Sequence, residues 1–241
     1  MIVNITVNYA KLKCPYNEKL QRIFESWNKI SNYGLFCLNY ADHNDDERKN
    51  RKFFLLENAR KIDGIRLFIE RYYQKQKITQ SEYFFLLASL IVSADKVANI
   101  TSVYGAYLKK FKSTARKNFQ FIPIHCYWQI PKYEKNQIFQ KNSLEIDSLN
   151  YHICYLDPPY NNRRKNYAPL NFLAIYKKEL DVYGKTGLIR DSFISSFCCK
   201  KTVFKSFTFL LDRIKSHYVL ISYNSEGLLT VSQLRTLFEN L

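Results

Sequence analysis

The sequence predicts an α/β protein in which a mainly helical region precedes a parallel sheet. Two long runs between residues 58 and 99 carry apolar side chains at the spacing of amphipathic helices. Two apolar runs rich in β-formers, 151–157 and 217–224, are each followed by a helix-forming segment. This alternation of strand and helix is typical of an α/β sheet.

Helices are expected in the first half of the chain. Residues 17–31 predict one helix, because apolar side chains recur three and four positions apart. The polar run 41–52 predicts a loop. Residues 58–76 and 79–99 predict two longer helices, the second of which opens on a Thr-x-x-Glu capping box.

The segment 99–119 interleaves aromatic and basic side chains. Tyr104, Tyr107 and Phe111 alternate with lysines and an arginine. Two interpretations stay open: a basic helix that contacts phosphates and stacks on bases, or an amphipathic helix with a solvated face.

Shorter elements are expected in the second half. Residues 121–131 predict a strand or extended link, and 136–143 predict a short strand and turn. Buried parallel strands and helices then alternate. In order, they are expected at 151–157, 204–216, 217–224 and 230–241.

The charge of the chain points to a polyanionic partner. It has 37 Lys and Arg against 21 Asp and Glu, a formal net charge of +16 that is spread along its length. Such a field attracts nucleic acid, because each neutralised phosphate releases counterions. The alternative is a basic surface that serves solubility alone.

Composition also argues against several classes of site. The cysteines form no C-x-x-C pair and the histidines fall at no metal-ligand spacing, so we expect no metal site. No G-x-G pattern occurs, so the usual nucleotide cradle of a Rossmann sheet is missing. The sequence shows neither a secretory signal nor an apolar run long enough to span a bilayer, which predicts a cytoplasmic protein.

The tetrapeptide Asp157-Pro158-Pro159-Tyr160 directly follows the first expected strand. Ligands of α/β sheets bind beyond the carboxyl ends of the strands. An exocyclic amine of a base is a poor nucleophile, and two acceptors can draw its nitrogen toward tetrahedral geometry: the Asp157 carboxylate and the Pro158 carbonyl, aimed by a backbone that proline stiffens. Tyr160 then offers a flat face to a flipped base.

Longer blocks around this motif carry a family resemblance. The chain resembles the Dam-like α-class of adenine-N6 DNA methyltransferases from about residue 45 to 241. The similar blocks are 52–66, 93–112, 155–176, 184–201 and 220–228. The resemblance implies S-adenosyl-L-methionine (AdoMet) as methyl donor, DNA adenine as acceptor, and a partial Rossmann-like AdoMet-dependent methyltransferase sheet with a mainly helical target-recognition region inserted.

The resemblance also assigns residues. Asp157, Pro158, Pro159 and Tyr160 are the expected catalytic residues, and Asp157 and Asn142 are the expected cofactor contacts. DNA contacts are expected from a basic helix near 104–112 and from later loops. The candidate DNA-binding residues are Lys96, Asn99, Tyr104, Lys109, Lys110, Arg163, Arg164, Tyr223 and Asn224.

One departure from the family pattern is visible. The F-x-G-x-G loop that grips AdoMet in the family has no counterpart in this sequence. The expected organisation is therefore a remnant N-terminal segment (1–44), a helical DNA target-recognition region (45–130) and the C-terminal part of a catalytic domain (131–241). The expected partners are double-stranded DNA and, if the enzyme is split, a separate N-terminal methyltransferase fragment.

Three hypotheses follow. The first is a site-specific adenine-N6 methyltransferase of a restriction-modification system, truncated or split. The second is a catalytically dead DNA-binding remnant. The third is an RNA or protein-glutamine methyltransferase, which Asp157 argues against, because those enzymes usually carry Asn at that position.

Overall fold

The computed structural model describes residues 15–43, 50–125, 139, 141–146, 151–160, 164–190 and 195–239. The chain divides into two compact units. The helical unit comprises residues 1–140 and 165–190, and the sheet unit comprises 141–164 and 191–241. The expected regions differ from this division in two ways: no boundary falls at 44, and residues 165–190 belong to the helical unit. The functional assignment of the three expected regions stays a prediction.

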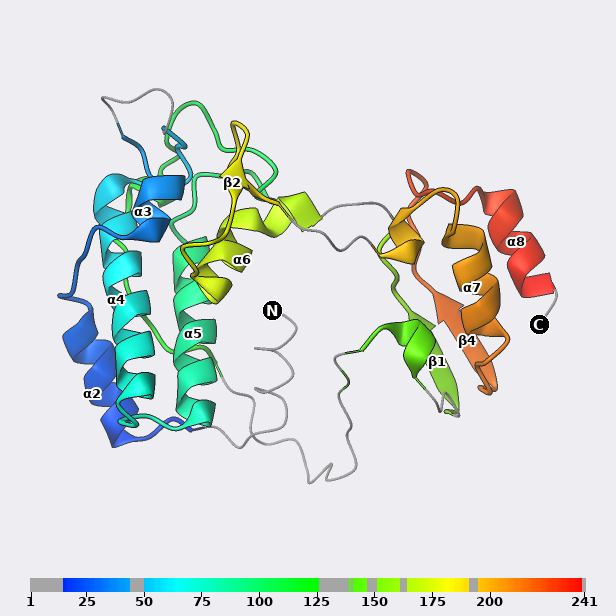
Figure 1. Ribbon diagram of the computed structural model, residues 1–241, viewed down its shortest axis with the longest axis horizontal. Coiled ribbons are helices and arrows are strands. Elements are labelled where there is room, and N and C mark those ends of the chain that lie inside the picture. The colour runs from blue at the N-terminus through cyan, green and yellow to red at the C-terminus, as the bar shows by residue number, and fades with distance from the viewer. Residues whose placement is uncertain are drawn as a thin grey trace. The chain divides into compact units, whose positions relative to one another are not determined.

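The helical unit is built from helices that pack around one core (Figure 1). Its described α-helices are α2 (Glu18–Trp27), α3 (Leu35–Tyr40), α4 (Leu56–Gln74), α5 (Gln80–Asp95) and α6 (Ala168–Ile175). Strands β2 (Val182–Tyr183) and β3 (Leu188–Ile189) form an antiparallel hairpin. Short 3-10 turns lie at η1 (Thr114–Arg116) and η3 (Arg164–Tyr167).

The three helices expected in the first half are confirmed as α2, α4 and α5. The capping box of α5 is also present. The Thr79 hydroxyl accepts a hydrogen bond from the Glu82 amide (3.2 Å), and the Glu82 carboxylate accepts one from the Thr79 amide (2.8 Å). The box satisfies two donors that a helix N-terminus otherwise leaves unpaired.

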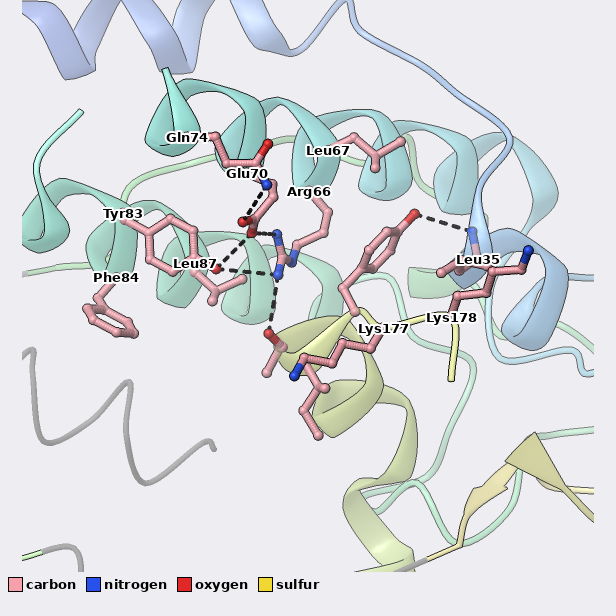
Figure 2. Close-up of a pocket in the computed structure, with 13 residues that line it drawn as sticks. Leu35, Arg66, Leu67, Glu70, Gln74, Tyr83, Phe84, Leu87, Lys177 and Lys178 are labelled. Carbon is pink, nitrogen blue, oxygen red and sulfur yellow. Dashed lines mark hydrogen bonds and ion pairs between the residues drawn. The ribbon is translucent and has the colours of Figure 1, made fainter. Parts of the chain in front are cut away.

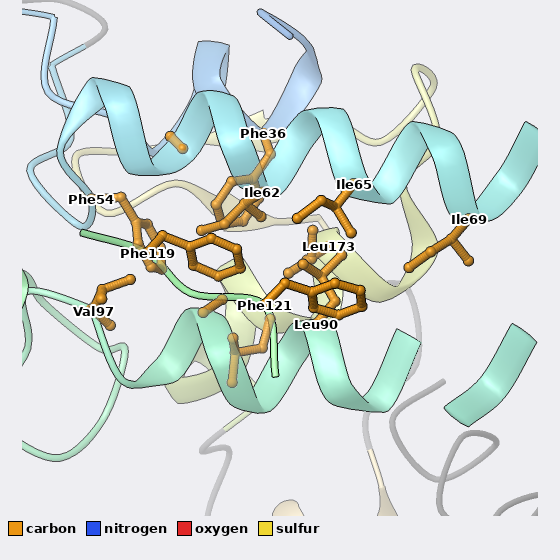
Figure 3. Close-up of a cluster of buried hydrophobic side chains, with 14 of the residues drawn as sticks. Phe36, Phe54, Ile62, Ile65, Ile69, Leu90, Val97, Phe119, Phe121 and Leu173 are labelled. Atoms are coloured by element: carbon orange, nitrogen blue, oxygen red, sulfur yellow. The ribbon is translucent and has the colours of Figure 1, made fainter. Parts of the chain in front are cut away.

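Part of the core of this unit lies between α4, α5 and α6 (Figure 3), and buried side chains of α2 and α3 belong to the same cluster. Ile62 and Ile65 of α4 are fully buried, together with Leu90 of α5 and Leu173 of α6. Phe121, from the extended segment that follows η1, is also buried in this cluster. Residues 121–125, the described part of the strand or extended link expected at 121–131, form no strand and agree with the extended link. The expected strand and turn at 136–143 lies mostly outside the described residues.

A buried carboxylate joins three parts of the helical unit. Asp63 of α4 is completely buried and accepts hydrogen bonds from the amides of Gly34 (2.8 Å), Phe36 (3.0 Å) and Cys37 (2.7 Å) at the start of α3. The Tyr176 hydroxyl also donates to it. Three orphan donors of a helix N-terminus are thus satisfied by one side chain.

The expected basic helix near 104–112 is wrong, because this segment is irregular. The buried Asn99 side chain donates to the Lys52 and Leu108 carbonyls (2.9 Å each) and accepts from the Lys112 amide (3.1 Å). These bonds use backbone groups that a helix would pair internally. Tyr104 is buried as well, so the segment folds over its own aromatic and amide side chains instead of forming a helix.

The sheet unit has the expected order of strand, helix, strand and helix. Strand β1 (Ile153–Leu156) pairs in parallel with β4 (Tyr218–Ile221), and helices α7 (Val203–Leu211) and α8 (Val231–Glu239) belong to the same core. The 3-10 turns η2 (Ser143–Glu145) and η4 (Ser196–Cys198) complete it. The α/β class is confirmed, whereas the extension of this two-stranded sheet into a larger Rossmann-like sheet stays a prediction.

Both strands were expected to be buried, but only one face of each strand packs on the core. Leu156, Val219 and Ile221 are partly buried and pack on the core with Phe207 of α7, whereas alternate positions on both strands are exposed.

Among the described residues, no helix is long and apolar enough to cross a membrane.

Candidate active site

Parallel pairing brings two loops of the sheet unit together. The register joins Ile153 to Tyr218 at one end and Leu156 to Ile221 at the other. The amide of Ser222 extends the ladder by donating to the Leu156 carbonyl (2.8 Å). The loops that follow β1 and β4 therefore start side by side at the carboxyl edge of the sheet, where α/β proteins bind ligands.

The loop 157–160 is tied to its surroundings through main-chain oxygens. The Tyr160 carbonyl accepts a hydrogen bond from the Leu228 amide (3.3 Å). The Pro159 carbonyl accepts one from the Cys198 thiol (3.6 Å) of η4. The two contacts connect the Asp-Pro-Pro-Tyr loop to the segment after β4 and to η4.

Aromatic rings line the same edge. The Tyr160 and Tyr223 rings lie edge to face, with centroids 6.0 Å apart, and Tyr223 makes a similar contact with Phe207 of α7 (5.9 Å). The Tyr223 hydroxyl accepts a hydrogen bond from the Leu229 amide (3.2 Å). Tyr223 is therefore held at both its ring and its hydroxyl.

Two acceptors at this edge are unused. Asp157 is exposed, and neither its carboxylate nor the Pro158 carbonyl accepts a hydrogen bond from any residue that the structure describes. An amino group with two N–H bonds requires two acceptors from adjacent positions. The end of β1 supplies them, one charged and one neutral.

The expected DNA-binding residues divide into exposed and buried groups. Lys96, Lys109 and Lys110 are exposed on the helical unit. Asn99 and Tyr104 are buried and hold the fold instead. The Tyr104 hydroxyl donates to Asp95 (2.8 Å), and burial raises its pKa well above the usual value. A ring in that position is not accessible for base stacking.

The other candidate DNA-binding residues lie in or next to loops of the sheet unit, or outside the residues that the structure describes. Tyr223 and Asn224 follow β4, and the Asn224 side chain accepts a hydrogen bond from the Glu226 amide (2.7 Å). Arg164 begins η3, and Arg163 lies outside the described residues.

Sequence reasoning missed two residues that shape the site, Cys198 and Gly227. The thiol of Cys198 contacts the Asp-Pro-Pro-Tyr loop, and no sequence pattern predicts that contact. The sequence did contain a signal for Gly227, because the pattern Asn224-x-x-Gly227 is typical of a turn. The Gly227 amide does donate to the Asn224 carbonyl (2.9 Å).

Position 227 requires glycine because the Tyr223 ring lies against its backbone. A Cβ atom at this position would lie 2.3 Å from Cε1 and 2.7 Å from Cζ of Tyr223. The Tyr223 ring is confined by Tyr160 and Phe207, so it has little room to retreat.

We therefore expect Gly227→Ala to displace Tyr223 and to lower the activity of the site by at least about tenfold, since misplacing groups that orient a reactant is costly. An NMR spectrum of a site-specifically labelled Tyr223 ring would report the displacement directly. Ser225→Ala, at an exposed position of the same turn, is the matched control and should change neither. A normal Tyr223 environment in Gly227→Ala would contradict the packing described.

A hollow of about 610 Å³ lies in the helical unit between α4, α5 and α6 (Figure 2). The buried polar group at its wall, the Arg66 guanidinium, is already paired. The buried Arg66 guanidinium donates to the Leu173 carbonyl (2.9 Å) and to the Glu70 carboxylate (3.0 Å), which also accepts from the Tyr83 hydroxyl (3.1 Å). This network joins three helices, and we assign it a structural role.

A strand-terminal loop with two open acceptors beside fixed aromatic rings has the groups needed to hold an amino group and the flat ring that carries it. The chain belongs to the D12 class N6 adenine-specific DNA methyltransferase family, whose profile matches residues 8–237.

Curated relatives agree with this assignment. The chain is 40% identical over 221 residues to the Type II methyltransferase M.CviAII of Paramecium bursaria Chlorella virus 1, an alignment that covers 91% of this chain and 65% of the relative. It is 40% identical over 209 residues to the Type II methyltransferase M.NlaIII of Neisseria lactamica (86% and 60% covered). It is 31% identical over 246 residues to the Type II methyltransferase M.FokI of Planomicrobium okeanokoites (98% and 36%). The chain thus spans less than two thirds of the length of these relatives, and no solved structure matches it significantly.

Membership in a methyltransferase family implies AdoMet as the methyl donor, and the two expected cofactor contacts fit that group poorly. Asn142 caps η2, where its side chain accepts from the Leu144 amide (3.2 Å). Asp157 is exposed at the end of β1. Neither residue belongs to a buried set of polar groups that would enclose a nucleoside and its amino-acid chain. The two expected cofactor contacts do not by themselves make an AdoMet site.

Proposed function

We propose that this chain carries the adenine-holding and DNA-contacting parts of an AdoMet-dependent adenine-N6 DNA methyltransferase of a restriction-modification system. The proposal rests on one observation: the Asp157 carboxylate and the Pro158 carbonyl are both open at the carboxyl end of β1. Family membership supports adenine as the base. The relatives' names, Type II methyltransferase and modification methylase, support the restriction-modification assignment.

The two acceptors match the chemistry of the adenine amino group. Its nitrogen lone pair is delocalised into the ring, which makes it a weak nucleophile. The Asp157 carboxylate accepts one N6–H and the Pro158 carbonyl accepts the other. Both bonds strengthen as positive charge develops on N6, so they stabilise the transition state more than the ground state.

The aromatic rings position the base. Adenine reaches this edge only if it leaves the duplex stack, at a cost of a few kcal/mol. Stacking on an aromatic side chain returns about 1–3 kcal/mol per base. Tyr160 supplies that face, and the contact with Tyr223 fixes the orientation of the rings.

Exposed lysines of the helical unit contact the DNA backbone. The Leu108 amide donates to the Asn99 carbonyl (3.0 Å), which places Lys109 and Lys110 beside the end of α5 and its C-cap, Lys96. In the described part of the chain these two lysines form no ion pair. They are therefore available for phosphate oxygens.

Removing Lys109 and Lys110 together should weaken DNA binding and reduce its salt dependence. We expect Lys109→Ala/Lys110→Ala to lower the magnitude of the slope of log K against log[salt] by about 1.8, since each phosphate contact contributes about 0.9. Fluorescence anisotropy with a labelled duplex at several salt concentrations measures it.

The control is Lys177→Ala/Lys178→Ala, which removes the same charge from another exposed pair of the helical unit. It should leave the slope within about 0.3 of the parent, a limit well below one phosphate contact. An equal effect of both double variants would show that only net charge matters and would refute the proposed contact.

A second function, DNA binding without catalysis, is favoured by the poor fit of Asn142 and Asp157 to AdoMet. The two functions differ in the role of Asp157. A binding module keeps its affinity for DNA and transfers no methyl group, with or without this carboxylate.

A further inference from the structure

Three main-chain carbonyls of the segment 156–160 are tied by hydrogen bonds from other elements. The donors are the Ser222 amide to Leu156 (2.8 Å), the Cys198 thiol to Pro159 (3.6 Å) and the Leu228 amide to Tyr160 (3.3 Å). Two of these donors are backbone groups that any residue except proline supplies. The third donor is a side chain, so the contact to Pro159 alone depends on which residue occupies the position of the donor.

The segment from Asp157 to Pro159 is stiff. A proline ring fixes φ at Pro158 and Pro159, and a residue that precedes proline is held in an extended conformation, which restricts Asp157 and Pro158. The next torsion, ψ of Pro159, has neither restriction because Tyr160 follows. The same torsion sets the direction of the Pro159 carbonyl. A donor that fixes this carbonyl therefore fixes how the stiff segment is oriented relative to Tyr160.

Cys198, the donor to this carbonyl, is held in place by its own element. At η4, the Cys198 amide donates to the Ser195 carbonyl (2.8 Å). The preceding side chain, Phe197, is buried and makes an edge-to-face contact with Phe207 of α7 (5.2 Å). Phe207 also contacts the Tyr223 ring (5.9 Å). One buried side chain thus supports both the element that carries the thiol and the ring beside the loop.

The neighbouring cysteine, Cys199, has a different environment. Its sulfur accepts a hydrogen bond from the Lys201 amide, which lowers the pKa of its thiol. The sulfur is therefore directed toward the start of α7. Cys199 differs from Cys198 in its contacts and not in its chemistry, which makes it the matched control.

We propose that Cys198 is a positioning residue for methyl transfer: its thiol fixes the Pro159 carbonyl and thereby aims the Asp157 and Pro158 acceptors at the amino group. The inference rests on the proposed function and adds a residue to it. Cys198 acts through the loop and not on the base itself. A thiol is a weak donor, and it suffices here because the prolines leave the loop little freedom to remove.

The orientation of the loop can be measured on a single carbonyl. Pro158-Pro159 is the only Pro-Pro pair in the sequence. Proline labelled with ¹³C at its carbonyl and with ¹⁵N therefore gives one one-bond correlation, from the Pro158 carbonyl to the Pro159 nitrogen. We expect Cys198→Ala to shift or split this NMR signal, because the loop then adopts more than one orientation. Cys198→Ser should restore a single signal, because a hydroxyl donates to the same oxygen. Cys199→Ala should leave the signal unchanged.

Methylation kinetics of the same variants separate positioning from binding. We expect Cys198→Ala to lower kcat by at least about tenfold, since a misplacement of about 1 Å can cost on the order of 10²-fold. The KM for DNA should stay within about twofold, because no contact to DNA is removed. Cys198→Ser should recover kcat to within about threefold of the parent, and Cys199→Ala should behave like the parent. Circular dichroism verifies that all three variants fold.

Four results would overturn the proposal. They are an unchanged carbonyl signal in Cys198→Ala, an equal loss of kcat in Cys198→Ala and Cys199→Ala, no recovery in Cys198→Ser, and a raised KM for DNA with kcat unchanged, which would assign Cys198 to DNA binding. Absence of methyl transfer by the parent chain would instead refute the proposed function. The carbonyl signal still tests Cys198 in that case, because the measurement requires neither AdoMet nor DNA.

Discussion

Asp157→Asn is expected to lower the rate of adenine methylation by about 10²–10³-fold while leaving duplex affinity within about twofold. The substitution keeps the size of the side chain but removes its charge and turns one acceptor into a donor. Loss of one preorganised electrostatic contact to a transition state typically has this magnitude. Single-turnover transfer of labelled methyl groups measures the rate, and anisotropy measures the affinity.

Asp212→Asn is the matched control, because Asp212 is an exposed carboxylate at the end of α7 in the same unit. It should behave like the parent. An unchanged rate in Asp157→Asn would mean that this carboxylate does not hold the amine. A parallel loss of affinity would instead assign Asp157 to DNA binding.

Asp63→Ala should lower the free energy of unfolding of the helical unit by about 3–5 kcal/mol. It deletes the acceptor of three buried amides at the start of α3 and of the Tyr176 hydroxyl. Each buried donor left unsatisfied costs about 1–3 kcal/mol, and part of this is recovered by relaxation. Urea unfolding followed by circular dichroism measures the change.

Glu57→Ala serves as the reference, since Glu57 is an exposed carboxylate in the first turn of α4. Its loss should cost less than about 1 kcal/mol, the usual size of a helix-dipole contribution. The loss of unfolding free energy in Tyr176→Phe should lie between the losses in Glu57→Ala and Asp63→Ala, because this substitution removes one donor and leaves the amides paired. A cost for Asp63→Ala no larger than that of Glu57→Ala would disprove the role of this carboxylate.

The sequence was informative wherever one local pattern decides the structure. Helices α4 and α5 were predictable because apolar spacing and the capping box agree. Strands β1 and β4 were predictable as apolar runs rich in β-formers. The place of Asp157 followed from its position after a strand, because parallel strands end at one edge of a sheet.

Long-range contacts explain what could not be predicted. The helix expected near 104–112 is absent because Asn99 binds backbone groups of Lys52, Leu108 and Lys112, and nothing local announces those partners. Tyr104 matched the pattern of a stacking aromatic and is a core residue. Composition does not separate the two roles, since both require a large apolar ring.

The groups expected to accept hydrogen bonds from a substrate were predictable from the sequence. The residues that hold the loop and the Tyr223 ring in place were not. Asp157 and Pro158 followed from the chemistry of the tetrapeptide. The contact of Cys198 with the Pro159 carbonyl and the closeness of Gly227 to the Tyr223 ring depend on how separate loops pack.

The measurement that bears most directly on the proposed function identifies the product. The chain is incubated with labelled AdoMet and unmethylated genomic DNA, which is then digested to nucleosides. We expect N6-methyladenine to carry the label, and the label to disappear with Asp157→Ala. DNA that is bound but gains no N6-methyladenine would contradict the account and leave a DNA-binding protein without methyltransferase activity.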